Sequence, residues 1–323
     1  MTPVKIGEVL DHYRIDAVVA RSGMASIFRA TDLNDGKQVA IKVPHPEMEC
    51  EPVLFERFQR EAEIGRMMDH PGVMKVYPKE KHNKVYMVME WVDGKLLRTI
   101  MSEQRPMPEE RALRIAINIL GALQHIHSRG VAHRDLKPEN IMVHDDDKIK
   151  LIDFGIASKS DARRLTFAKL SQVMGTPDYI SPEQVKGKRG DARSDLYSLG
   201  VILYEMLTGK VPFTGANPFA IMNERVLNNP PPPRSINSQI SPELQEIIYR
   251  ALEREPTNRY KTADEFAWDL AHPEQVGVAE RVEELTNWKQ RRDPWARRAA
   301  FYVAMALIPI VVLGLLFFVA KHV

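Results

Sequence analysis

"HRDLKPEN" (residues 133–140) and "LIDFGIA" (residues 151–157) are the two stretches on which the interpretation of this chain depends. The first places an aspartate, a lysine and an asparagine within six positions, and the second places an aspartate between an apolar run and a glycine. Neither stretch keeps a helical or strand period across these polar residues, so we expect both aspartates to lie on loops.

These polar side chains match the needs of phosphoryl transfer, which depends mainly on the positioning of charge. Asp135 would orient an attacking hydroxyl, and Lys137 would steady the phosphoryl group. Mg²⁺ prefers oxygen ligands, which Asn140 and Asp153 provide, and Gly155 permits a tight turn beside a metal. Each residue alone fits a solvated loop equally well, so the prediction rests on the whole set.

The composition narrows the class of protein. A chain of 323 residues is long enough for one large or two modest domains with a sizeable core. Its 45 basic and 43 acidic residues give no excess of charge that would favour nucleic acid as a partner. The single cysteine, Cys50, excludes an internal disulfide and indicates a reducing compartment.

The last part of the sequence predicts a membrane span. Residues 299–320, "AAFYVAMALIPIVVLGLLFFVA", contain no charged side chain. At about 1.5 Å per residue, a helix of this length crosses a hydrocarbon core about 30 Å thick. A buried core helix is the alternative, and Pro309 would kink a span rather than prevent it.

The residues before this predicted span orient it in the membrane. Because basic residues stay on the cytoplasmic side, we expect a single-pass protein of the inner (cell) membrane whose preceding part is cytoplasmic. Residues 1–16 lack the apolar core of a signal peptide. The basic residues that precede the span are Lys289, Arg291, Arg292, Arg297 and Arg298.

Residues 1–90 have the pattern of a small β-rich part. One helix, at residues 52–68, interrupts the strands, and "DLNDGKQ" (32–38) has the composition of a hairpin turn. The sequence therefore predicts an antiparallel sheet with one helix beside it. The predicted strands are residues 13–20, 25–32, 38–44 and 85–92.

Residues 91–272 have a helical period instead. Apolar residues recur at spacings of three and four in 108–130, which ends at a glycine, and in 195–209 and 241–253. A β-rich part followed by a larger helical part predicts an α+β fold of two lobes with a cleft between them. A basic juxtamembrane linker, residues 273–298, follows; its apolar spacing fits a short helix that packs on the second lobe or on lipid.

The motifs together resemble the eukaryotic-type (Hanks-type) serine/threonine protein kinases, and in particular the membrane-bound bacterial members. The resemblance covers roughly residues 12–272. It rests on "HRD" (133–135), "DFG" (153–155), "VAIK" (39–42), "REAE" (60–63) and "MGTPDYISPE" (174–183). It implies a bilobal kinase fold, with residues 1–90 as the N-lobe and 91–272 as the C-lobe, followed by the transmembrane helix 299–320.

The resemblance also implies a reaction and its partners. The chain would transfer the γ-phosphate of Mg-ATP to serine or threonine of proteins, including itself. Lys137 and "GTPDY" (175–179) favour serine and threonine over tyrosine as acceptors. Protein substrates and the membrane are the expected partners, and a homodimer is allowed by the resemblance but not required by it.

Roles for single residues follow from the same resemblance. Lys42 would contact the α- and β-phosphates and pair with Glu61. Glu183 would pair with Arg259, and Asp195 would anchor the backbone of the catalytic loop.

The adenine of ATP would lie beside the segment that links the lobes. The backbone of Glu90 and Val92 would meet the adenine edge, and Met89 would be the gatekeeper. Apolar side chains would sandwich the ring, namely Ile27, Ala40 and Met142.

The loop that should cover the phosphates departs from the family pattern. In "VARSGMASI" (Val19, Ala20, Arg21, Ser22, Gly23, Met24, Ala25, Ser26, Ile27), Ala20, Ser22 and Ala25 stand where three glycines are expected. Glycine there permits positive φ and a close approach of N–H groups to phosphate. One interpretation is a stiffer lid with weaker ATP affinity and slower turnover. The other is a membrane-tethered pseudokinase that acts as a binding scaffold. The presence of all the charged catalytic residues argues against this second interpretation.

Regulation by phosphorylation is a further expectation. Arg134 stands beside Asp135 and would pair with a phosphate on the loop that follows residue 155. Thr166 and Ser171 are the candidate acceptors, and the alternative is that neither is modified.

Overall fold

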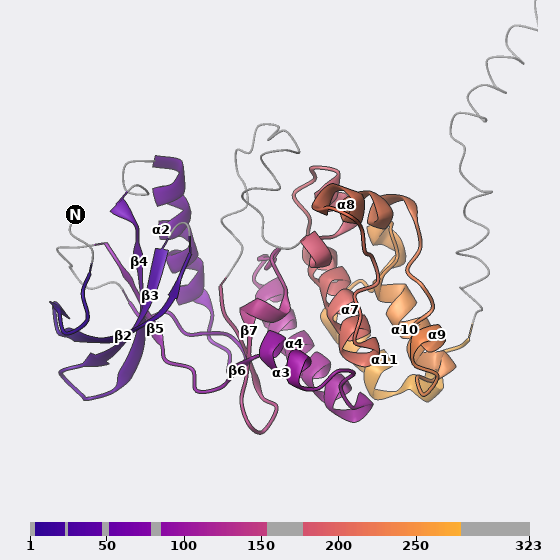
Figure 1. The fold of residues 1–323 in the computed structure, drawn as a ribbon, viewed down its shortest axis with the longest axis horizontal. Coiled ribbons are helices and arrows are strands. Elements are labelled where there is room, and N and C mark those ends of the chain that lie inside the picture. The colour runs from indigo at the N-terminus through magenta and orange to yellow at the C-terminus, as the bar shows by residue number, and fades with distance from the viewer. Residues whose placement is uncertain (1–3, 23–24, 47–51, 79–84, 154–176, 279–323) are drawn as a thin grey trace, which may run out of the picture. The chain divides into compact units, whose positions relative to one another are not determined.

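The computed structural model describes residues 4–22, 25–46, 52–78, 85–153 and 177–278. Its N-terminal part is an antiparallel sheet in the order β1-β2-β3-β4-β5 (Figure 1). The hairpin predicted at residues 32–38 is confirmed, and Gly36 takes the positive φ (74°) that the turn requires. The strands are β1 (Val9–Leu10), β2 (Tyr13–Arg21), β3 (Ala25–Asp32), β4 (Gln38–Pro44) and β5 (Met87–Glu90).

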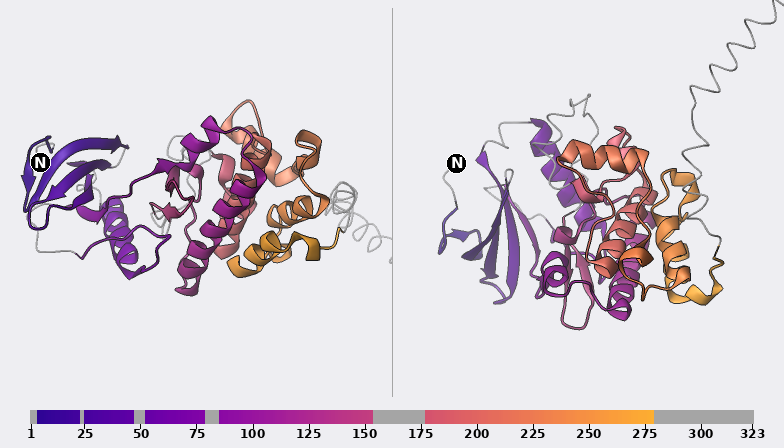
Figure 2. Two further views of the ribbon diagram at one scale, coloured as in Figure 1. Left: turned by 90° about the horizontal axis from the view of Figure 1, so that it is seen from below. Right: turned by 45° about the vertical axis from the view of Figure 1, so that its right-hand side comes forward.

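Helix α2 (Pro52–Met67) lies beside this sheet (Figures 1 and 2). Phe58 and Ala62 are buried in one cluster with residues of β4 and β5, as the apolar spacing predicts. Gly65 marks a close approach, since a Cβ added there would lie 2.3 Å from Cγ2 of Val76. The glycine therefore sets how deeply α2 packs.

The C-terminal part is mainly helical, with a second small sheet in the order β6-β7-β8. Helix α7 is buried along nearly its whole length and packs against α4 and α10 (Figure 1). Gly200 of α7 permits this, since a Cβ there would lie 2.8 Å from Cβ of Ala251 in α10. The strands and longer helices of this part are β6 (Lys95–Leu96), α3 (Leu97–Glu103), α4 (Glu109–Ser128), β7 (Ile141–Val143), β8 (Ile149–Leu151), α7 (Ala192–Thr208), α8 (Pro218–Leu227), α10 (Pro242–Ala251) and α11 (Ala263–Ala271).

Short helical turns connect these elements. All six begin at a proline, whose fixed φ suits the first helical position. They are η1 (Pro138–Asn140), η3 (Pro177–Tyr179), α6 (Pro182–Val185), α9 (Pro233–Ile236), η4 (Pro256–Asn258) and η5 (Pro273–Gln275).

The bilobal α+β fold predicted from the sequence is confirmed. The predicted strands appear as β2 to β5, and the four predicted helices appear as α2, α4, α7 and α10. Helix α4 ends just before Gly130, which has the positive φ (71°) expected after a helix end. The exact lobe boundary at residue 90 stays a prediction.

The predicted membrane span 299–320, and the part of the linker from residue 279 onward, lie outside the described residues. Within the part of the chain that is described, we find no helix with both the length and the apolar character that crossing a bilayer requires.

Candidate active site

Lys42 lies at the centre of the site. It projects from β4, and its Nζ lies 2.7 Å from Oε1 of Glu61 on α2 and 2.6 Å from Oδ1 of Asp153, which follows β8. The side chains of Lys42 and Glu61 are only 13% and 12% exposed. The ion pair expected between them is thus formed, and the same ammonium also holds the aspartate of the "DFG" motif.

Burial and charge act in opposite directions on this triad. Burial alone would lower the pKa of Lys42, but the charges of Asp153 and Glu61 outweigh it and raise the pKa. Burial raises the pKa of Glu61, although Lys42 opposes the shift. For Asp153, burial is outweighed by the charge and hydrogen bond of Lys42, so the pKa falls. A cation and an ionised Asp153 are therefore kept side by side at neutral pH.

Asp135 lies on the loop before η1 and is held at both its backbone and its carboxylate. Nζ of Lys137 lies 2.7 Å from its Oδ2, and Nδ2 of Asn140 donates to its Oδ2 (3.0 Å) and its backbone oxygen (2.8 Å). The side chain is 48% exposed. A fixed but accessible carboxylate of this kind is what the orientation of an incoming hydroxyl requires.

The side chain of Asp195 anchors the backbone of this loop. Asp195 is fully buried in α7, and its carboxylate accepts hydrogen bonds from the N–H groups of His133 (2.8 Å) and Arg134 (2.7 Å). Arg134 has a φ of 65°, which is unusual for a residue with a side chain and costs on the order of 1–3 kcal/mol. The expected anchoring by Asp195 is confirmed, and it holds the loop in this strained form.

A backbone contact brings the segments of Asn140 and Asp153, the two expected metal ligands, together. The N–H of Ile152 donates to the backbone oxygen of Asn140 (2.9 Å), and Asp153 itself has a φ of 61°. The Nδ2 group of Asn140 is bonded to Asp135, which leaves its amide oxygen as the atom that would bind a metal. An amide oxygen and a carboxylate fit a hard divalent cation such as Mg²⁺.

The loop between β2 and β3 is closed by its own serine. The hydroxyl of Ser22 accepts from the N–H of Ala25 (3.1 Å) and donates to the oxygen of Ala25 (3.1 Å), which also accepts from the N–H of Ser22 (2.9 Å). The N–H of Ala25 is therefore bonded within the loop. Gly23 and Met24 lie outside the described residues.

The other loop residues lie on the two flanking strands. Val19, Ala20 and Arg21 form the exposed end of β2, and Ala20 pairs with Ile27 of β3. The hydroxyl of Ser26 bonds to Nε2 of His45 (3.0 Å). Ile27 in turn pairs with Lys42, so the segment 19–27 ends beside the central lysine.

The residues expected around adenine come from three strands. Ala40 of β4 pairs with Met89 of β5, Val92 follows β5, and Met142 is half-buried in β7. The N–H of Glu90 donates to the oxygen of Lys75 (2.9 Å), so its carbonyl oxygen is the group that we expect adenine to meet. Roles toward a nucleotide stay predictions for all of these residues.

Two polar partners in this region were missed by the sequence reasoning. The carboxylate of Glu90 accepts from the N–H of Lys75 (2.7 Å) and from Nζ of Lys150 (2.6 Å). Nε2 of His127 lies 2.8 Å from Oδ2 of Asp195. Lys150 and Glu90 are 60 residues apart, and His127 and Asp195 are 68 residues apart, so no local pattern indicates these two contacts.

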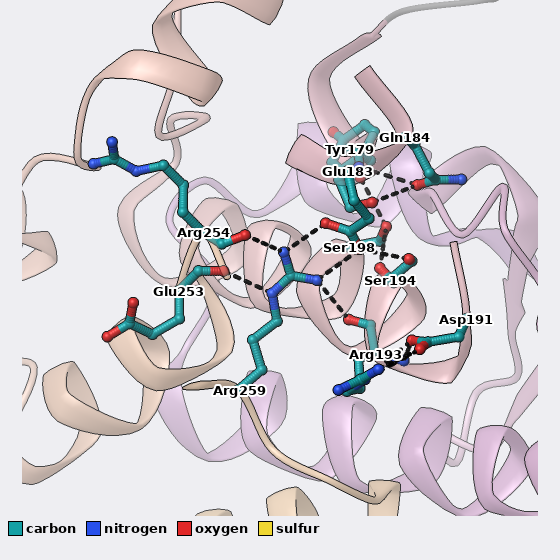
Figure 3. A network of polar contacts seen from close by, with 11 residues as sticks. Tyr179, Glu183, Gln184, Asp191, Arg193, Ser194, Ser198, Glu253, Arg254 and Arg259 are labelled. Carbon is teal, nitrogen blue, oxygen red and sulfur yellow. Dashed lines mark hydrogen bonds and ion pairs between the residues drawn. The ribbon is translucent and has the colours of Figure 1, made fainter. Parts of the chain in front are cut away.

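The segment expected to receive the substrate is fixed to the C-terminal lobe (Figure 3). The guanidinium of Arg259 bonds to both oxygens of Glu183 (2.8 and 2.7 Å) and to the carbonyl oxygens of Glu253 and Arg254. Ser194 donates to the same carboxylate (2.6 Å). The expected pair of Glu183 and Arg259 is therefore confirmed, as a buried and bidentate contact.

Comparison with known proteins gives one consistent family. The model described as "Protein kinase domain" matches residues 13–269. A probable serine/threonine-protein kinase of Streptomyces coelicolor is 39% identical over 263 residues, which are 80% of this chain and 39% of that protein. The serine/threonine-protein kinase PknB of Mycolicibacterium smegmatis is 37% identical over 279 residues, which are 84% of this chain and 45% of that protein.

The fold comparison agrees with the sequence comparison. The crystal structure of the Mycobacterium tuberculosis PknI kinase domain is similar with a TM-score of 0.65 and 26% identity, covering 85% of this chain and 100% of that chain. The present chain spans less than half the length of the two curated relatives above. With its motifs, its bilobal fold and its match over residues 13–269, the chain belongs to the protein kinase family, and to the bacterial serine/threonine type within it.

Proposed function

We propose that this chain is an active serine/threonine protein kinase that uses Mg-ATP and phosphorylates proteins, itself included. The observation that carries the proposal is the position of Lys42, whose ammonium bonds to both Glu61 and Asp153. Three ionisable residues from distant parts of the sequence meet there, and their burial costs desolvation free energy. A protein that served only as a binding scaffold would have no need of such a buried cluster.

The roles of the chain's own residues follow from their contacts. Asp135 orients the acceptor hydroxyl and takes up its proton, while Lys137, already 2.7 Å from Asp135, lies ready to steady the transferring group. Lys42 binds phosphate oxygens. Asn140 and Asp153 are the residues that would hold Mg²⁺, which supplies charge neutralisation at the phosphates when bound.

The pseudokinase alternative rests only on the loop at residues 19–27. Its three glycine positions carry small side chains, and Ser22 bonds to the N–H of Ala25 that a phosphate would otherwise use. Such a loop weakens nucleotide binding without removing any charged group. We therefore expect a kinase with low ATP affinity rather than a scaffold.

Phosphorylation of the chain itself would act through Arg134. Its Nε lies 3.3 Å from the oxygen of Gly190, and its pKa is lowered by burial and then by the positive charge of Arg189. A second cation near the guanidinium favours the arrival of an anion. Thr166 and Ser171, the proposed acceptors, lie outside the described residues.

Attachment to the inner (cell) membrane is part of the proposal, with residues 299–320 as a single span and the kinase domain in the cytoplasm. The support is the charge-free sequence and the basic residues before it. A second copy of the chain is a candidate partner, and analytical ultracentrifugation of the detergent-solubilised protein tests this homodimer.

The decisive experiment uses the full chain in detergent with radiolabelled ATP. The wild-type protein should label itself and a generic protein substrate on serine and threonine in the presence of Mg²⁺, and chelation should abolish the signal. Asp135→Asn should lose at least about a hundredfold in rate, because the group that orients the hydroxyl is removed. Equal labelling by the two proteins would refute the proposal.

A further inference from the structure

Two histidine rings lie against each other where residues 69–73, the segment that follows α2, meet α4. The ring centroids of His70 in this segment and His125 in α4 are 4.9 Å apart. Nδ1 of His70 accepts a hydrogen bond from the N–H of Gly72 (3.0 Å), and Nε2 of His125 accepts one from the N–H of Asp69 (3.3 Å). Each ring therefore holds one backbone N–H of the segment 69–73.

The segment 69–73 also packs closely on α4 and bonds to β8. A Cβ added to Gly72 would lie 3.0 Å from Cβ of Ala122 in α4. The N–H of Leu151 in β8 donates to the oxygen of Gly72 (2.9 Å), and the N–H of Met74 donates to the oxygen of Leu151 (3.0 Å). The segment thus joins α4 to the strand that ends two residues before Asp153.

Both carboxylates that bond to Lys42 depend on the position of this segment. Glu61 lies on α2, which ends two residues before the segment begins, and Asp153 follows β8. Nζ of Lys42 bonds to both carboxylates. A shift of the segment would move the elements that carry Glu61 and Asp153, and displacements of about 1 Å at positioning groups lower reaction rates strongly.

Only neutral rings can make the two bonds to the segment. A second proton on either imidazole would occupy the nitrogen that now accepts a backbone N–H. For His125 the other nitrogen offers no alternative, since Nη1 of Arg129 lies 3.1 Å from Nδ1. Both ring nitrogens of His125 therefore face N–H donors, and a protonated ring would have to turn away from them.

The surroundings of the rings also disfavour protonation. Burial has the largest effect and lowers the pKa of both histidines below the usual 6.5. The positive charges of His125, Lys150 and Arg129 lower the pKa of His70 further. Arg129 acts likewise on His125, where Asp69 opposes it. The closed segment is therefore fully stable above the pKa of exposed rings and loses stability as the pH falls through the lowered values.

We propose that His70 and His125 are positioning residues for phosphoryl transfer: their neutral rings hold the segment 69–73 against α4 and β8, and protonation of either ring releases the segment and lowers kinase activity. This inference rests on the proposed kinase function. It adds a dependence on pH that does not come from Asp135, the group that takes up the proton of the acceptor.

The test replaces both rings by amides, whose oxygens accept the same bonds but take up no proton near neutral pH. In the double variant His70→Asn, His125→Gln, the asparagine oxygen replaces Nδ1 of His70 and the glutamine oxygen replaces Nε2 of His125. Values of kcat/KM for a generic protein substrate are measured with the full chain in detergent at about pH 7.5 and about pH 5.5, on either side of the usual titration of histidine.

The ratio of the double variant to wild type decides the outcome, because the titration of Asp135 is common to both proteins and cancels. We expect a ratio within about twofold of one at the higher pH and about fivefold or more at the lower pH, as for the loss of one hydrogen bond in the wild type. His125→Leu, which has no acceptor, should lose about fivefold already at the higher pH. His272→Gln, whose ring stacks on Trp268 of α11, is the matched control and should follow wild type at both pH values.

Hydrogen exchange of peptides that cover residues 69–76, measured by mass spectrometry, reports on the segment without catalysis. At the lower pH the wild-type protein should exchange faster there than the double variant, while at the higher pH the two should agree. The inference would be overturned by an activity ratio that is the same at both pH values, or by equal exchange of the two proteins at the lower pH. Absence of any kinase activity would count against the proposed function, while exchange would still decide the role of the histidines.

Discussion

At the scale of single residues, buried charge pairs hold the parts of the site in place. Arg259 and Glu183 are 2% and 7% exposed, and each makes several hydrogen bonds with the other and with neighbouring groups. Removal of one partner leaves an uncompensated buried charge, which typically costs about 3–5 kcal/mol. This pair therefore holds the substrate segment on the C-terminal lobe, and loss of either partner should lower the stability of the fold.

We predict that Glu183→Gln lowers stability by about 3 kcal/mol at pH 7 and by less in acid. Burial acts to raise the pKa of Glu183, but the hydrogen bonds and charge of Arg259 outweigh it and lower the pKa below its usual 4.5. A lowered pKa contributes stability above the unfolded value, and this is lost as the pH falls through the folded value. Thermal unfolding of the wild-type protein and of Glu183→Gln, followed from about pH 7 down to about pH 3, measures how their difference in stability changes as Glu183 is protonated.

The control for this prediction is Asp35→Asn. Asp35 pairs with Lys37 in an exposed hairpin, so its replacement should leave the melting temperature unchanged within error at pH 7. A gap between wild type and Glu183→Gln that stays constant across the pH range would show that the carboxylate charge is not the source of the stability.

At the scale of elements, the depth at which α2 packs decides whether the Lys42 pair forms. Gly65 lies one helical turn after Glu61, and its missing side chain lets Val76 approach the helix backbone. An added Cβ would lie well inside van der Waals contact with a branched, buried side chain. Helix α2 would then shift away and carry Glu61 with it.

We predict that Gly65→Ala reduces kcat by about tenfold, because a shift of about 1 Å at a positioning group has effects of this order or larger. The matched control is Gly121→Ala in α4, where nothing lies within 4 Å of the added Cβ. The control should keep full activity and gain up to about 1 kcal/mol from helix propensity. Steady-state kinetics and thermal melts of both variants test this prediction. Equal kcat values for Gly65→Ala and Gly121→Ala would contradict it.

The loop between β2 and β3 gives a second prediction at this scale. Ser22→Gly removes the hydroxyl that bonds to the N–H of Ala25 and so frees this group for phosphate. We expect KM for ATP to fall about threefold with kcat little changed, as for a gain in uniform binding. Ser102→Ala, whose hydroxyl bonds to the oxygen of Thr99 on α3, is the control. An increase in KM would show that the serine stabilises the loop in its binding form.

At the scale of the whole molecule, the sequence predicted those helices and strands that a local residue pattern defines. The strand residues 38–44 appear unchanged as β4, because alternation and a turn at Gly36 define them. The motif "VAIK" led to the contact of Lys42 with Glu61 through the family resemblance. The hydrogen bond from Nη1 of Arg98 to Oε1 of Glu205 (2.9 Å) could not be predicted, since 107 residues separate the partners and only the fold brings them together.

The C-terminal segment gives a prediction for the complete chain in cells. The full-length protein should remain with the membrane pellet after alkaline carbonate extraction, because 22 residues without charge bury far more apolar surface than a peripheral contact does. A chain that stops at residue 278 should stay in the supernatant. Release of the full-length protein by carbonate would exclude a spanning segment.

The attachment of η3 to its surroundings has a consequence for the thermodynamics of recognition. Ser198 and Arg225 fix the backbone of Pro177, Asp178 and Tyr179 before any peptide arrives. Association therefore restricts the conformational entropy of the incoming peptide, but not that of this turn. A substitution on α8, remote from the phosphoryl group, would loosen the turn and weaken peptide affinity through entropy alone, while the contacts in the bound complex stay the same.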